Sequence, residues 1–287
     1  MENKTPKVGL VMKSLQADFF KVMQQGAEKF VDETKCCELT STGTDTQTEI
    51  DKQVSLVREL ADAGMDALVV VPIDSKALVA PVAYAVGKGL TVVNIDIKLD
   101  DTLLDKEGIK VDFVGPDNFT ASYAAGKRLA SVLEKGDKVI MIEGLPVADN
   151  AQQRKAGFDK AIAEQGLDCV ASEPANWETA TAEEVFTRLY AAHPDIKAVF
   201  CCNDAMALGV INVLKAAGRK PGEIKIVGFD NDAVMSPLLA EGWLLATVDA
   251  YASQMGVEGI RHALRLLDGN KRSSGDKATE FTVIEGN

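Results

Sequence analysis

The sequence predicts an α/β protein with two doubly wound parallel-sheet lobes joined by a multi-strand hinge. Short apolar runs alternate with helical segments along nearly the whole chain, which is typical of parallel sheets covered by helices. The alternation starts again near Lys138, and 287 residues suit two domains of about 100 to 150 residues each. Two elements that follow Asp249 are too short to form a third core, so we expect them to complete the two lobes.

The first half of the chain alternates strands and helices with short connections. Gly64 and the Gly87–Gly89 pair stand where helix C-caps are expected. We expect strands at Lys7–Met12, Glu38–Thr42, Asp66–Val71, Leu90–Ile95 and Val111–Val114, and helices from Asp18 onward, at Thr46–Ala63, Ser75–Lys88 and Thr120–Leu133.

The second half repeats this pattern. We expect strands at Lys138–Ile142, Cys169–Ser172, Ala198–Cys202, Ile224–Val227, up to Asp249 and at Lys277–Ile284, and helices at Ala151–Gln165, Ala180–Ala192, Met206–Ala216 and Ser253–Leu267.

The late elements imply that the chain crosses between the lobes more than once, which makes a hinge. The strand ends of both lobes would then face one cleft. We expect one lobe at residues 1–116 with 250–278, and the other at 117–249 with 279–287.

Composition and charge exclude several classes of function. A net charge of −12, with no basic run longer than Lys271-Arg272, makes nucleic acid a poor partner. No segment approaches the roughly 20 apolar residues of a membrane helix. Residues Met1–Lys7 are polar and do not form a signal peptide, which fits a cytoplasmic protein or a mature exported domain.

The chain lacks the usual signatures of an enzyme or a metal site. There is no phosphate-binding glycine loop and no GxSxG turn. His193, before Pro194, and His262 both lie in helical segments beside ordinary surface or turn residues, so we expect structural roles. The vicinal pairs Cys36-Cys37 and Cys201-Cys202 are expected to be small apolar filler. We therefore expect no catalytic activity, no metal and no cofactor.

Polar side chains stand at the ends of five expected strands. In open α/β sheets this edge binds ligands, so their recurrence favours a polar ligand. The alternative, in which each residue only closes a turn or caps a helix, stays open. These residues are Lys13, Asp96, Asn203, Asp230 and Asp249.

Aromatic residues follow two of the strands. Phe19 and Phe20 are consecutive at a helix start, so we expect one ring to point away from the core. Trp177 lies in a loop after a strand of the second lobe. Aromatic rings pack against the apolar faces of a sugar, and polar groups then bond its hydroxyls. The alternative is that these rings only anchor loops to the core.

Over nearly its whole length the chain resembles the periplasmic monosaccharide-binding proteins of ABC transporters, in particular the ribose-binding-protein group and its allose-binding members. Several stretches occur in the same order and spacing. They are VGLVMKSLQADFF, VVPIDSKALVAPVA, VVNIDIKLDD, GPDNFTASYAAGKRLA, QQRKAGFDKAI, ASEPANWE, AVFCCNDAMALG, VGFDND and LLATVDA.

The resemblance implies a role for each candidate residue. Phe19, Phe20 and Trp177 would enclose the sugar ring. The hydroxyls of the sugar would be bonded by Lys13, Asp96, Arg154, Asn203 and Asp230. The resemblance further implies a periplasmic monomer that delivers its sugar to a membrane permease.

The chain departs from the family pattern at Ala17, Ile97 and Ala250, where the family usually has polar contacts. Asp249 or Asp74 would have to replace them. The ligand is therefore expected to differ from allose or ribose in its hydroxyl pattern, and a cyclic or linear polyol fits as well.

A second hypothesis is the sugar-sensing core of a LacI-type transcription regulator, which shares the bilobed fold. Such a protein carries a helix-turn-helix of roughly 50 to 60 residues before the first strand. Only about six residues precede the strand here, and the surface is acidic, so we expect the transport role.

Overall fold

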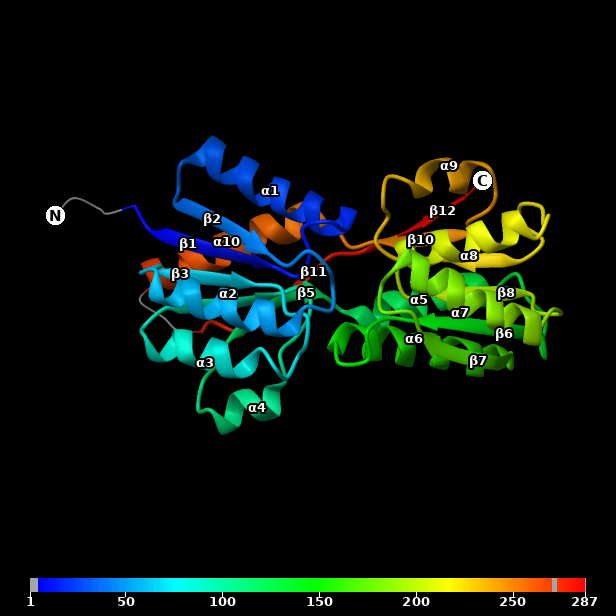
Figure 1. Ribbon diagram of the computed structural model, residues 1–287, viewed down its shortest axis with the longest axis horizontal. Helices are drawn as coiled ribbons and strands as arrows, with labels where there is room; N and C mark the ends of the chain where they lie inside the picture. Colours follow the sequence, from blue (N-terminus) through cyan, green and yellow to red (C-terminus); the bar gives the residue numbers. More distant parts are fainter. Residues whose placement is uncertain (1–4, 270–272, 287) are drawn as a thin grey trace. The chain divides into compact units, whose positions relative to one another are not determined.

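The computed structural model describes residues 5–269 and 273–286, and they divide into two compact units (Figure 1). Unit 1 holds the described parts of 1–116, 147–149 and 251–279, and unit 2 those of 117–146, 150–250 and 280–287. Each unit contains one six-stranded sheet. The α/β class and the two doubly wound sheets agree with the fold expected from the sequence.

Unit 1 is a parallel sheet with strand order β11-β5-β4-β3-β1-β2. Helices α1 and α10 pack on one face, and α2 and α3 on the other (Figure 1). The central strands are apolar because both faces are covered, as in Leu68 and Val70, which are fully buried. Its elements are β1 Lys7–Met12, α1 Asp18–Thr34, β2 Glu38–Gly43, α2 Ile50–Asp62, β3 Ala67–Val70, α3 Val79–Gly87, β4 Thr91–Ile95, α4 Asp101–Lys106, β5 Asp112–Pro116, α10 Ala252–Asp268 and β11 Lys277–Thr279.

Unit 2 has strand order β12-β10-β9-β8-β6-β7, in which only β12 is antiparallel to its neighbour. Helices α7 and α8 pack against each other, and α5 packs along α6 where Gly126 faces Ala161. Its elements are α5 Asn118–Ala130, β6 Lys138–Glu143, α6 Asp149–Gln165, β7 Asp168–Pro174, α7 Thr179–Ala192, β8 Ala198–Cys201, α8 Asp204–Ala216, β9 Lys225–Val227, α9 Met235–Ala240, β10 Ala246–Asp249 and β12 Thr282–Glu285.

Several boundaries differ from those expected. The single last strand is two strands, because β11 pairs with β5 in unit 1 and β12 pairs with β10 in unit 2. Helix α2 begins at Ile50, four residues late, because the Glu49 carboxylate holds residues 45 and 46 in a turn. Helix α5 begins early because Asp117 caps it by accepting from Thr120 N at 2.9 Å. The short helices α4 and α9 were not expected.

The units also divide slightly differently from the expected lobes. Ala250 belongs to unit 2 and Thr279 to unit 1. Residues 147–149, expected in the second lobe, are part of unit 1. They are held there by Ser75, whose N–H donates to Val147 O at 3.2 Å and whose hydroxyl accepts from Asp149 N at 2.9 Å.

The two histidines have different surroundings. His193 ends α7 as its C-cap residue, as expected. His262 is not beside ordinary surface residues, because it is buried and lies 2.8 Å from the Asp112 carboxylate. Arg265 approaches His262 Nδ1 at 3.0 Å, and since a guanidinium only donates, Nε2 carries the proton and donates to Asp112. The side chain of Ser273 and the N–H of Ser274 also bond Asp112.

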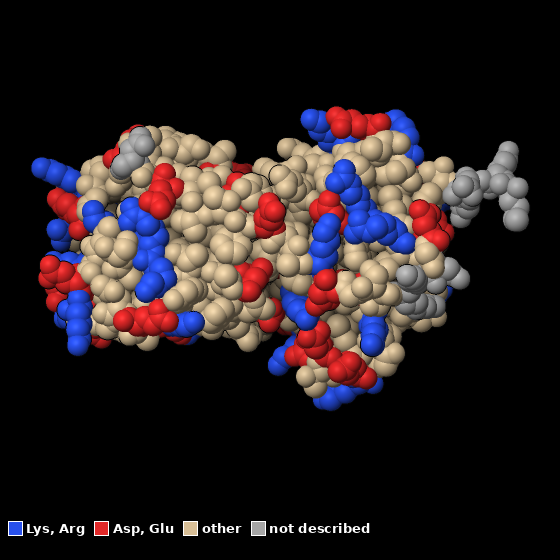
Figure 2. All heavy atoms as spheres, turned by 180° about the vertical axis from the view of Figure 1, so that it is seen from behind, with Lys and Arg blue, Asp and Glu red and all other residues tan. Residues whose placement is uncertain are grey.

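The surface carries both signs of charge. Figure 2 shows Lys and Arg side chains interspersed with Asp and Glu over the face it displays. None of the described helices combines the length and the apolar character of a bilayer span. Among residues 5–269 and 273–286, no group of three or more His, Cys, Asp or Glu side chains is placed to hold a metal ion. The five cysteines are all free thiols, and burial raises the pKa of Cys202 to about 12.

Candidate functional site

In unit 1 the residue after β1 and the first residues of α1 lie together. Lys13 is 1% exposed although it carries an ammonium group, and its Nζ lies 5.6 Å from the centre of the Phe20 ring. The Thr44 hydroxyl bonds the Lys13 carbonyl and fixes the strand end. Burial of a lysine in this way is rare, and it indicates a local environment built for a cation.

The expectation that Phe19 or Phe20 points away from the core is wrong. Both side chains are buried, at 6% and 5% exposure. Their ring centres are 5.2 Å apart with planes at 89°, an edge-to-face pair. Because each ring covers the other, two consecutive rings are buried at one helix start.

Asp96 follows β4 in a strained turn. It is buried, and its φ of +66° is unusual for a residue other than glycine. The side chain of Asn94 supports this turn, since its amide donates to Ile97 O at 2.7 Å and its carbonyl accepts from Leu99 N at 2.8 Å. Sequence reasoning missed Asn94, although a buried amide two residues before the candidate Asp96 was a usable signal.

Gln53 in α2 is a second residue that sequence reasoning missed. Its fully buried amide donates to Met12 O at 3.1 Å and to Val71 O at 2.7 Å, and it accepts from Ile73 N at 2.8 Å. It thereby joins the ends of β1 and β3. The signal in the sequence was a polar residue on the apolar face of a helix.

Arg154 is the centre of the candidate residues in unit 2. It is 2% exposed and extends from α6. Its Nε donates to Asn118 Oδ1 at 2.9 Å, and its Nη1 donates to Cys202 O at 2.6 Å and to Asp230 Oδ1 at 3.5 Å. Asn118, the first residue of α5, was not singled out from the sequence.

Aromatic rings surround this guanidinium. The Arg154 guanidinium carbon lies 3.5 Å from the centre of the Phe229 ring and 5.5 Å from that of Trp177. Trp177 is buried and has a φ of +71°. Its ring fills the space beside Gly144, where a Cβ atom would lie 2.1 Å from the indole. Only a glycine at position 144 therefore leaves room for the ring.

The remaining strand-end residues of unit 2 join the same group. Asn203 caps α8 by accepting from Met206 N at 2.9 Å, and its amide donates to Trp177 O at 3.3 Å. Asn203 therefore does cap a helix, which was the alternative considered for it. Its side-chain amide also links it to the loop that carries Trp177. Asp249 accepts from Asn231 Nδ2 at 3.1 Å, next to Asp230 in the chain.

Two sets of residues result. The unit 1 set is Lys13, Phe19, Phe20 and Asp96, and the unit 2 set is Arg154, Trp177, Asn203, Asp230 and Asp249. Each set combines a cation, one or more carboxylates and aromatic rings at the carboxyl ends of parallel strands. Such groups can donate to and accept from neutral hydroxyls and can pack against an apolar ring face.

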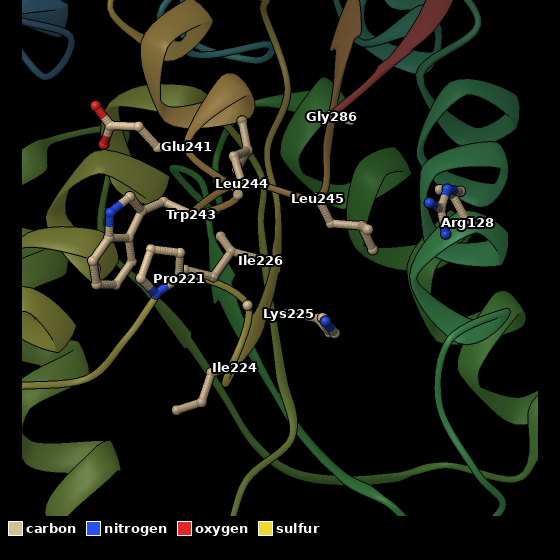
Figure 3. A pocket seen from close by; sticks show the side chains of 12 residues that line it. Arg128, Pro221, Ile224, Lys225, Ile226, Glu241, Trp243, Leu244, Leu245 and Gly286 are labelled. Carbon is tan, nitrogen blue, oxygen red and sulfur yellow. The ribbon is translucent and has the colours of Figure 1, made fainter.

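A hollow of about 290 Å³ elsewhere in unit 2 has a different character (Figure 3). It lies where β9 and β10 begin, at the amino ends of these strands. Ile226, Leu244 and Trp243 give it apolar walls, with Lys225 and Arg128 on another side. It contains no member of the unit 2 set.

The fold and the strand-end chemistry define a class of ligand-binding protein. The family model described as a periplasmic binding protein domain matches residues 8–271, and the chain belongs to this family.

Individual relatives agree with this assignment. The chain is 42% identical over 265 residues to the D-ribose/D-allose-binding protein of Pseudomonas aeruginosa, covering 92% of this chain and 83% of that protein.

Solved structures agree as well. An ABC transporter solute-binding protein from Burkholderia multivorans, with an unknown ligand interpreted as α-D-erythrofuranose, matches with a TM-score of 0.94 and 36% identity over 98% of this chain and 99% of that chain. Another from Actinobacillus succinogenes, with bound D-allose, matches with a TM-score of 0.91 and 31% identity over 98% of each chain.

Proposed function

We propose that this chain is the solute-binding component of an ABC importer and that it binds a monosaccharide or a related polyol in the periplasm. The observation that carries the proposal is the unit 2 set, in which Arg154 is held between aromatic rings and beside the Asp230 carboxylate. Ionised groups bond neutral hydroxyls with about 1.5 to 3 kcal/mol each, so a few such contacts suffice for tight binding. The relatives that bind ribose and allose support the class of ligand.

We further propose that both sets contact the same sugar and that the protein does no chemistry on it. Contacts from two units favour the ligand-bound conformation by their differential affinity, which a permease can recognise. In this proposal the protein acts as a monomer, and the sugar leaves it unchanged. Incubation with each sugar followed by NMR would reveal any product.

Three apolar positions bear on the choice of sugar. Ile97 and Ala250 are buried, at 0% and 1% exposure, and Ala17 lies just before α1. A hydroxyl facing such a side chain would lose its hydrogen bonds with water and gain none. We therefore propose a ligand with fewer hydroxyl contacts than a hexose. The panel should include a four-carbon sugar, since a four-carbon furanose was assigned in the Burkholderia multivorans relative.

Isothermal titration calorimetry tests the assignment. The panel consists of D-ribose, D-allose, D-erythrose, erythritol and myo-inositol. Asp96→Ala and Asp230→Ala should each weaken binding of the preferred ligand more than tenfold. Asp195→Ala, which removes an exposed carboxylate paired with Lys138, is the control and should bind as the wild type does. Unchanged affinity in both site variants would refute the assigned site.

A further inference from the structure

Asp204 is a fully buried carboxylate next to a member of the unit 2 set. It follows Asn203 in the chain and is the first residue of α8. Burial raises its pKa well above the ordinary value for aspartate, with Asp232 adding to the effect. A carboxylate is rarely fully buried unless it has a structural or functional role. Asp204 is not one of the residues proposed to contact the ligand.

The hydrogen bonds of Asp204 lead to the loop that carries Asp230. Its Oδ2 accepts from Asp232 N at 3.0 Å, and its own backbone N–H donates to Phe229 O at 2.7 Å. The hydroxyl of Thr247, which is fully buried in β10, donates to Asp204 Oδ1 at 2.8 Å. That hydroxyl oxygen in turn accepts from Asn231 N at 3.3 Å.

Four backbone amides of residues 228–232 have acceptors in β10 or on Asp204. Those of Gly228 and Asp230 donate to the β10 carbonyls of Ala246 and Val248, at 3.0 and 2.7 Å. The amide of Asp232 donates to Asp204 directly, and that of Asn231 donates to the Thr247 hydroxyl, which bonds Asp204. The loop needs this support because Asp230 and Asn231 have φ values of +115° and +55°, which residues with a side chain rarely adopt.

Close packing adds a steric reason. A Cβ atom on Gly228 would lie 2.0 Å from Asp204 Oδ1, so the glycine lets the loop backbone approach the carboxylate. The same loop positions the Phe229 ring over Arg154 and the Asp230 carboxylate beside it.

We propose that Asp204 and Thr247 are positioning residues, which hold the loop 228–232 in the conformation that presents Asp230 and Phe229 to the ligand. The consequence for sugar affinity rests on the proposed function, whereas the consequence for the loop itself does not. Neither residue contacts the ligand in this proposal, so their effect acts through Asp230.

Hydrogen–deuterium exchange of the segment 228–232 tests the loop without any sugar. Thr247→Val keeps the volume and removes the bridging hydroxyl, and it should speed exchange in this segment by about tenfold or more. Thr247→Ser restores a hydroxyl and should exchange within about twofold of the wild type. Thr91→Val, the same change at a buried strand threonine in unit 1, is the control and should leave the segment unaffected. Wild-type exchange in Thr247→Val would overturn the proposal.

Calorimetry with D-ribose and D-allose tests the link to binding. Thr247→Val should raise the Kd about tenfold, and Thr247→Ser should recover most of the loss. Asp204→Asn keeps the shape but turns one acceptor into a donor, so it should weaken binding as well. A loosened loop with unchanged affinity would overturn the positioning role. If neither sugar binds the wild type, the proposed function fails for these sugars, and the exchange experiment still decides whether Asp204 and Thr247 hold the loop.

Discussion

At the scale of single residues, Arg154 is the side chain on which the unit 2 set depends. Its planar guanidinium stacks on Phe229 while its edge donates to Asn118, Cys202 and Asp230. A lysine ammonium is a compact point charge that cannot stack and donate along an edge at once. The stacked, hydrogen-bonded guanidinium therefore orders the whole set.

We expect Arg154→Lys to weaken sugar binding by about tenfold to a hundredfold, because it removes charge-assisted hydrogen bonds without removing the charge. Calorimetry measures the effect. The matched control is Arg219→Lys, which changes an arginine lying 5.6 Å from the centre of the Tyr190 ring, outside the set. Equal affinity in Arg154→Lys and the wild type would contradict this view of Arg154.

Gly144 determines the place of the Trp177 ring by leaving room for it. We expect Gly144→Ala to displace the ring, since the new methyl group would lie 2.1 Å from the indole. Sugar affinity should fall at least about tenfold, with a shifted Trp177 emission. Fluorescence of Trp177 alone can be read in a Trp243→Phe background, because the chain has two tryptophans.

The control for this change is Gly87→Ala at the end of α3, where nothing lies within 4 Å of the new Cβ. This variant should bind and fluoresce as its parent does. An unmoved emission spectrum in Gly144→Ala would count against the steric argument.

At the scale of elements, a buried cluster joins α10 to the start of β5. Asp112 accepts from His262 and from the segment 273–274, which leads into β11. Burial by itself would raise the pKa of Asp112, but the hydrogen bonds from Ser273, Ser274 and His262 outweigh it, so the pKa is lowered overall. Ionised Asp112 therefore stabilises the native state.

A lowered pKa fixes the sign of a pH effect. The unfolded chain binds the proton more readily, so this stabilisation is present above the ordinary pKa of about 3.9 and is lost as pH falls through the lowered value. We expect Asp112→Asn to be less stable than the wild type at pH 7, with a difference that shrinks below about pH 4. Urea unfolding from pH 7 to 3 measures it, and a difference that grows on acidification would be the opposite of this expectation.

The long elements could be predicted from the sequence, and the short ones could not. Helices α1 and α10 show apolar residues at regular helical spacing, so their existence follows from the pattern. Helices α4 and α9 have six residues each, too few for a periodic signal. Strands β11 and β12 were expected as one strand over Lys277–Ile284, and only their pairing with different sheets separates them.

At the scale of the whole molecule, the chain passes between the units at residues 116/117, 250/251 and 279/280, besides the short excursion of 147–149. A ligand that contacts both units binds only the native state, so its binding energy adds to stability. The unfolding temperature is therefore a readout that does not depend on any one residue.

A ligand at a hundred times its Kd should stabilise the native state by about 2.7 kcal/mol. For a chain of this size the melting temperature should rise by about 5 to 10 °C. Differential scanning calorimetry with each sugar and polyol of the panel measures this rise. L-arginine, which lacks a sugar's hydroxyl pattern, is the negative control. A melting temperature that no member of the panel raises would contradict the proposed function.

By itself, the sequence determined the fold class, the family resemblance and the candidate positions, because strand-end polar residues and helical periodicity are local features of the chain. The supporting roles of Gln53, Asn94, Asn118 and Asp204 became evident only from the tertiary structure. Their side chains bond groups up to 43 positions distant or buried backbone, and no local pattern records such partners. Burial of both Phe19 and Phe20 was likewise decided by packing, since the space around two adjacent rings is set by the other elements of the fold.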